Sequence, residues 1–134
     1  MTPTRSVYLD SSAIVKDVLP EAETAALRRF LTGRPSRVSS ALARVETMRA
    51  AMRSSDAGAL HRASQVLARI TLLDVSDAIL SVAAGLQPPT LRALDAIHLA
   101  SALALGGDLD GLVTYDDRLA EAARLAGLTV YTPR

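Results

Sequence analysis

Short apolar runs alternate with longer stretches of helical periodicity along the whole chain. The apolar runs predict strands at residues 6–9, 37–39, 71–75, 112–115 and 128–131. The helical stretches cover residues 13–19, 21–31, 41–53, 56–69, 77–86, 91–105 and 117–126. Strands that alternate with helices in this way predict an α/β fold, in which a parallel β-sheet is flanked by α-helices.

Composition narrows this picture. A length of 134 residues allows one hydrophobic core, so we expect a single domain over residues 1–134. Hydrophobic residues make up 49% of the chain but aromatic residues only 3%, so aliphatic side chains must build the core. The absence of cysteine excludes disulfides, thiolate metal sites and thiol nucleophiles. No apolar run approaches the length of a membrane span or a signal peptide, and we expect a cytoplasmic protein with no membrane partner.

Two aspartates follow predicted strands, where parallel α/β proteins bind their ligands. Asp10 comes directly after the strand at 6–9, and Asp116 directly after the strand at 112–115. Ligands of such sheets lie at the carboxyl ends of the strands, near a switch in strand order. Each aspartate on its own could instead cap the helix that follows it. Two of them at strand ends indicate a shared site.

Asp95 lies in a helical segment that is apolar on almost every face. It shares one face with Leu91, Leu99 and Ala102. A carboxylate in this position is costly to bury unless it is paired, hydrogen-bonded or bound to a cation. An ion pair with Arg92 or His98 is one explanation. We prefer a metal site, with His98 packed beside Asp95.

Glu46 is the one acidic residue in the basic stretch between residues 24 and 55. Seven arginines accompany it: Arg28, Arg29, Arg34, Arg37, Arg44, Arg49 and Arg53. Glu46 lies at the edge of an apolar stripe formed by Ala41, Val45, Met48 and Met52, which we interpret as core or subunit interface. The arginines could face RNA, a protein partner or a second subunit, or could simply lie on solvated helix faces.

Four carboxylates that converge in an apolar setting require positive charge between them. With no cysteine and two histidines, a zinc site is disfavoured. Oxygen ligands suit Mg²⁺, with Mn²⁺ as a substitute. Such ions activate water and stabilise charge on a phosphate. This set of carboxylates, in a chain without cysteine, therefore predicts metal-dependent hydrolysis of phosphodiester bonds.

At four places the sequence resembles the PIN-domain ribonucleases. The segments are 7–16 (VYLDSSAIVK), 44–46 (RVE), 94–100 (LDAIHLA) and 113–119 (VTYDDRL), and together they span the chain in the family's order. The resemblance implies an α/β/α sandwich in which Asp10, Glu46, Asp95 and Asp116 bind the metal. Ser12 and Thr114 would support the site through their hydroxyl groups, and Asp117 could join them or simply begin its helix.

A chain of this size looks like a VapC toxin of a bacterial toxin–antitoxin pair. That resemblance implies a homodimer, inhibition by a small VapB-like antitoxin, and a structured RNA substrate such as tRNA or rRNA. A catalytically inactive PIN-like domain that binds RNA or protein is the alternative. Haloacid-dehalogenase phosphatases and receiver domains fit poorly, because both need a later lysine and the only lysine is Lys16.

Overall fold

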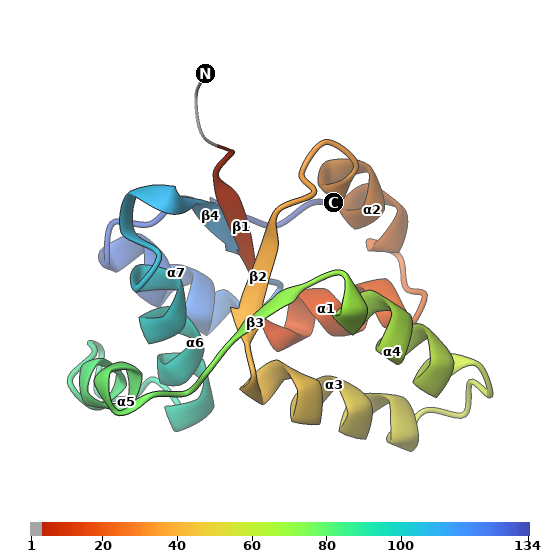
Figure 1. The fold of residues 1–134 in the computed structure, drawn as a ribbon, viewed down its shortest axis with the longest axis horizontal. Helices are drawn as coiled ribbons and strands as arrows, with labels where there is room; N and C mark the ends of the chain where they lie inside the picture. Colours follow the sequence, from red (N-terminus) through yellow and green to blue (C-terminus); the bar gives the residue numbers. More distant parts are fainter. Residues whose placement is uncertain (1–3) are drawn as a thin grey trace.

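The computed structural model describes residues 4–134, which form five strands and seven α-helices in alternation (Figure 1). The strands are β1 (Ser6–Leu9), β2 (Arg37–Ser40), β3 (Thr71–Leu73), β4 (Leu109–Val113) and β5 (Val130–Tyr131). The helices are α1 (Ser11–Val18), α2 (Thr24–Leu31), α3 (Leu42–Arg53), α4 (Ala59–Ala68), α5 (Asp77–Ala84), α6 (Ala93–Leu103) and α7 (Asp117–Leu125), and the short 3₁₀ helix η1 (Gly106–Asp108) precedes β4. The predicted α/β class is confirmed.

All five strands are parallel, in the order β3-β2-β1-β4-β5. The chain builds outward from β1 to one edge of the sheet and then returns to the other side of β1 with β4. The strand order therefore reverses between β1 and β4. Ligands of such sheets bind outside the carboxyl ends of the strands at this reversal. We therefore expect the functional side chains in the segments that follow Leu9 and Val113.

Two hydrophobic layers cover the sheet, one on each face. Val7 and Leu9 of β1 pack into the layer that includes α1, α2, α3 and α4. Tyr8, between them in sequence, points to the opposite layer with α6 and α7. This alternation follows from the two-residue period of a strand. Figure 1 shows the two groups of helices on either side of the sheet, with α5 packed outside against α6.

Every predicted helix and strand exists, but several boundaries were wrong and the 3₁₀ helix η1 was not predicted. Helix α1 begins at Ser11 rather than residue 13, because Asp10 caps it. Strand β4 ends at Val113 instead of residue 115, so Asp116 comes three residues after the strand. Thr114 backbone N–H still bonds to Tyr131 carbonyl, but Tyr115 N–H is taken by the Ser12 hydroxyl, which draws the chain out of the ladder.

The predicted apolar stripe on α3 is wrong as a core face. The buried residues of this helix are Ala43, Thr47 and Ala51. Val45 and Met52 are 57% and 66% exposed, and only Met48 of the stripe contacts the core. Small residues face inward because α3 packs closely against α1 and α4. In the described part of the chain, no helix is long and apolar enough to cross a membrane.

Candidate active site at the carboxyl ends of β1 and β4

Asp10 is a buried carboxylate between the ends of β1 and β4. Only 3% of the residue is exposed. Its Oδ1 accepts hydrogen bonds from Ala13 N (2.9 Å) and Ser12 Oγ (2.7 Å), and its Oδ2 accepts one from Thr114 Oγ1 (2.6 Å). Burial raises the pKa of Asp10, although these hydrogen bonds oppose the shift. The predicted supporting roles of Ser12 and Thr114 agree with this geometry.

Asp10 caps α1, and this role does not exclude the predicted role in a site. The capping bond to Ala13 uses Oδ1 alone. Asp116 behaves likewise at α7, because its Oδ1 accepts from Leu119 N at 2.9 Å and its Oδ2 stays free of the helix. Each aspartate therefore keeps one carboxylate oxygen for other partners.

Asp116 and Asp95 share one cationic partner, Arg92. The Arg92 Nη2 lies 3.1 Å from Asp116 Oδ2, and its Nε lies 3.2 Å from Asp95 Oδ2. The Arg92 side chain is 66% exposed, so this contact faces solvent. The pKa of Asp95 is nevertheless raised, first by burial and then by the negative charge of Asp116, against the effect of Arg92. Asp95 and Asp116 thus lie close enough for their negative charges to repel each other.

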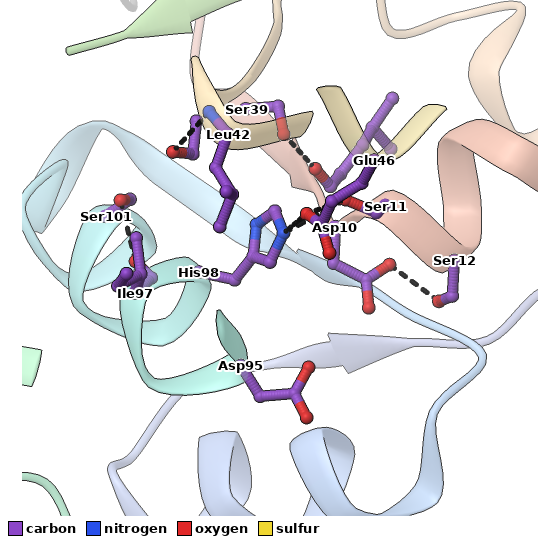
Figure 2. A network of polar contacts seen from close by, with 12 residues as sticks. Asp10, Ser11, Ser12, Ser39, Leu42, Glu46, Asp95, Ile97, His98 and Ser101 are labelled. Atoms are coloured by element: carbon purple, nitrogen blue, oxygen red, sulfur yellow. Dashed lines mark hydrogen bonds and ion pairs between the residues drawn. The ribbon is translucent and has the colours of Figure 1, made fainter. Parts of the chain in front are cut away.

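Glu46 takes part in a separate cluster, reached from α1, α3 and α6. His98 Nε2 lies 2.8 Å from Glu46 Oε1, and the Ser11 hydroxyl donates a hydrogen bond to the same oxygen. Burial raises the pKa of Glu46, but the bonds from His98 and Ser11 outweigh it and the net shift is downward. In Figure 2 the His98 ring points toward Glu46 and Ser11, while the carboxylates of Asp10 and Asp95 point into the space beside them.

The structure thus brings the predicted acids to one end of the sheet, but in three local arrangements. Asp10 is bound to Thr114 and Ser12, Asp95 and Asp116 are joined through Arg92, and Glu46 is held by His98. Within residues 4–134, no three acidic or histidine side chains lie close enough to form one set of metal ligands. The acids share a region without sharing a single coordination sphere.

The structure adds detail to two predictions about individual residues. His98 lies near enough to Asp95 to influence its pKa, but its ring nitrogens bond to Glu46, Ser11 and Tyr8. Asp95 makes the ion pair with Arg92, and its predicted role as a metal ligand stays a prediction. Asp117 is exposed in the first turn of α7, as expected of a residue that begins a helix.

Ser11, Tyr8 and His98 form the hydrogen-bonded network that holds Glu46, and the sequence analysis gave none of them a role in the site. Tyr8 belongs to the buried run of β1, where an aromatic residue predicts core and nothing more. Ser11 carries no local signal beyond its place after the strand. A buried histidine in an apolar helix was the one available signal, because such a group requires hydrogen-bond partners.

Three of the seven arginines between residues 24 and 55 are held by structural contacts. Arg28 bonds to Asp17, Arg34 stacks over Phe30, and Arg37 donates to the Arg34 and Leu31 carbonyls. Arg53 instead lines an open cleft of about 470 Å³ beside Glu46, together with Ser11, Ser12, Lys16 and Tyr115. Arg53 puts positive charge next to Glu46, whereas the Lys16 ammonium is already paired with Glu21 and Glu23.

Comparison with known proteins places this geometry in context. The sequence matches the PIN domain family over residues 7–125. It is 51% identical over 128 residues to Ribonuclease VapC46 of Mycobacterium tuberculosis, which covers 96% of this chain and 98% of the relative. A chain of a toxin–antitoxin complex from Klebsiella pneumoniae superposes with a TM-score of 0.72 at 22% identity, over 96% of this chain and 98% of the other. The Mycobacterium tuberculosis VapC20 toxin, which cleaves the sarcin–ricin loop, also gives 0.72, at 15% identity over 95% and 99%.

Proposed function

Because the chain belongs to the PIN-domain family, we propose that it is an endoribonuclease that acts as the toxin of a toxin–antitoxin pair. The observation that carries the proposal is the buried Asp10 at the strand-order reversal, with Asp95 and Asp116 beside it. We further propose that residues 1–134 form one such domain, that it works in the cytoplasm, and that its substrate is a structured RNA such as tRNA or rRNA.

A divalent cation fits the residues present. Asp10 makes no ion pair with any side chain in residues 4–134, and the pKa values of Asp10 and Asp95 are both raised by burial. A cation near them would favour the ionised carboxylates. All the donors are oxygens, as Mg²⁺ and Mn²⁺ prefer, and Mg²⁺ needs only one or two direct carboxylates because it keeps several waters. Dispersed acids therefore suit Mg²⁺.

In this proposal Asp10, Asp95, Asp116 and Glu46 would hold the metal partly through its water molecules, since no three of these side chains lie close enough together to bind it directly. Mg²⁺ or Mn²⁺, when bound, supplies a Lewis acid that activates water and stabilises negative charge on the phosphate. Ser12 and Thr114 keep the Asp10 carboxylate oriented through their hydroxyl groups. Arg53 in the adjacent cleft would supply positive charge for the RNA backbone.

Exposed apolar side chains suggest two protein interfaces. Leu80 and Val82 of α5 and Leu94 of α6 are 44–48% exposed beside a groove of about 460 Å³ between these helices. We assign this face to the homodimer. Val45 and Met52 on α3 lie next to Glu46 and the cleft that Arg53 lines. A VapB-like antitoxin bound to this apolar surface would cover the site. Light scattering tests the dimer: Leu80→Arg should give a monomer, whereas Leu125→Arg on the distant α7 should not.

The decisive experiment is RNA cleavage by the purified chain, with and without Mg²⁺ or Mn²⁺. Asp10→Asn and Asp95→Asn should abolish metal-dependent cleavage. Asp108→Asn is the matched control, because Asp108 is exposed and precedes β4 at the other end of the strand. Cleavage that survives both site substitutions would refute the assignment of the site. A folded chain that binds tRNA or rRNA without cutting either in any metal would refute the nuclease and favour a binding domain.

A further inference from the structure

His98 is an almost completely enclosed polar side chain beside the acids. The residue is 1% exposed, and both of its ring nitrogens have partners. Nε2 lies 2.8 Å from Glu46 Oε1 and 3.1 Å from Ser11 Oγ, and Nδ1 lies 2.8 Å from Tyr8 Oη. The ring therefore links β1, α1 and α3 to its own helix α6, as Figure 2 shows for Ser11 and Glu46.

The partners determine where the protons lie. An ionised Glu46 can only accept, so Nε2 carries the hydrogen that is donated to Oε1. Tyr8 is completely buried, and burial raises the pKa of its hydroxyl, which therefore keeps its proton. The Tyr8 hydroxyl can then donate to Nδ1, while Nε2 donates to Oε1 of Glu46.

Tyr8 also fixes the direction of the ring. The two rings meet edge to face, with centroids 5.8 Å apart and an interplanar angle of 75°. Tyr8 is part of β1, which is hydrogen-bonded to both β2 and β4 in the centre of the sheet. The orientation of His98 is thus set by the central strand of the sheet, and His98 in turn orients Glu46.

Both donors to Glu46 act on the same oxygen. His98 and Ser11 bond to Oε1, while Oε2 accepts no hydrogen bond from the residues that the structure describes. The Glu46 side chain is 26% exposed, so Oε2 can be reached by a ligand. One oxygen is restrained by the protein, and the other is available.

We propose that His98, held by Tyr8, is a positioning residue that restrains Oε1 of Glu46 and leaves Oε2 as the metal ligand. This inference rests on the proposed function, because it assumes that Glu46 binds the cation. It differs from a reading in which His98 is a counter-ion that competes with the metal. Positioning predicts weaker metal binding when His98 is replaced, whereas competition predicts tighter binding.

The test is the affinity for Mn²⁺ alone, measured by calorimetric titration of the full chain. His98→Leu should weaken Mn²⁺ binding by about 10–100-fold, the usual effect of removing a partner that orients a metal ligand. His98→Gln, whose amide can still donate to Oε1, should recover part of the loss. When His98→Leu is added to Glu46→Gln, it should weaken Mn²⁺ binding no further, because His98 acts on the metal only through the Glu46 carboxylate.

RNA cleavage supplies a second readout. In His98→Leu, half-maximal cleavage should require more Mn²⁺, while the rate at saturating Mn²⁺ should stay near that of the unmodified chain. Should His98→Leu fail to fold, Tyr8→Phe tests the same idea. It removes only the hydroxyl that orients Nδ1 and should weaken Mn²⁺ binding by a smaller factor.

Three results would overturn the inference. They are unchanged or tighter Mn²⁺ binding in foldable His98 and Tyr8 variants, an equal loss in the presence and absence of Glu46→Gln, and no recovery in His98→Gln. If the unmodified chain binds no Mn²⁺ and cuts no RNA, the proposed function fails together with the inference. If it does both and Asp10→Asn abolishes both, while the His98 variants behave normally, only the role of His98 is refuted.

Discussion

Thr114 and Thr47 are both completely buried threonines, and their hydroxyl groups have opposite surroundings. Thr114 Oγ1 donates to Asp10 Oδ2 at 2.6 Å and accepts from Asp116 N at 3.0 Å. Thr47 Oγ1 has no hydrogen-bond partner within residues 4–134. The same substitution, Thr→Val, should therefore have opposite effects at the two positions.

The expected size of each effect follows from these contacts. Thr114→Val removes a hydrogen bond to a charged group, which contributes about 1.5–3 kcal/mol, and leaves the half-buried Asp116 N–H without its acceptor, so we expect a loss of about 2–4 kcal/mol. Thr47→Val removes a buried hydroxyl that has lost its hydration, and should stabilise the fold by about 1–2 kcal/mol. Helix propensities of threonine and valine are similar, so backbone preference adds little at Thr47.

Thermal unfolding without metal measures both changes. For 134 residues the unfolding entropy is about 0.28 kcal/mol/K, so Thr114→Val should lower the Tm by roughly 7–14 °C and Thr47→Val should raise it by roughly 4–7 °C. Thr114→Ser restores the hydroxyl and should lose only the methyl group, at about 1 kcal/mol. Equal destabilisation by the two valine variants would refute the reasoning, because it would mean that hydroxyl partners do not control the outcome.

Three further predictions concern the sheet edge and the acids. Gly111→Ala should destabilise the fold by about 1–3 kcal/mol in urea unfolding, since its Cβ would lie 2.5 Å from the Tyr131 ring, whereas Gly107→Ala meets nothing within 4 Å and should be neutral. Because burial raises the pKa of Asp10 above 3.8, the folded state holds that proton more tightly than the unfolded chain, and stability should fall as pH rises through the raised pKa. Asp10→Asn should be more stable than the unmodified metal-free chain at neutral pH, with a difference that shrinks toward pH 4; a constant difference across urea titrations would contradict this. Arg92→Gln should change stability by less than about 1 kcal/mol, since the side chain is 66% exposed, yet should tighten Mn²⁺ binding by removing a competing cation.

Local patterns determined the elements and the identity of the acids. Apolar periodicity located every helix and strand, and the placement of Asp10 and Asp116 after strands pointed to the reversal of strand order. Asp95 could be recognised because a carboxylate in an apolar helix needs compensation. The inferences about helices and strands succeed because each depends on a few neighbouring residues, whose spacing decides which face they share.

The grouping of the acids was decided only by the tertiary structure. The sequence predicted that Asp10, Asp95, Asp116 and Glu46 form one cluster. In the structure, however, Glu46 is held by His98 and Ser11. Arg92 lies between Asp95 and Asp116. The inward face of α3 was missed for a related reason. Its small residues pack against α1 and α4, so Val45 and Met52 face outward despite being more hydrophobic than Thr47.

The physical reason is that helix rotation and side-chain direction depend on contacts between distant segments. His98 and Tyr8 are 90 positions apart in the sequence, and no local pattern relates them. Their contact exists because β1 lies at the centre of the sheet and α6 crosses the face to which Tyr8 points. The sequence by itself determined which residues could do chemistry, and the packing of α3 and α6 on β1 decided which of them meet.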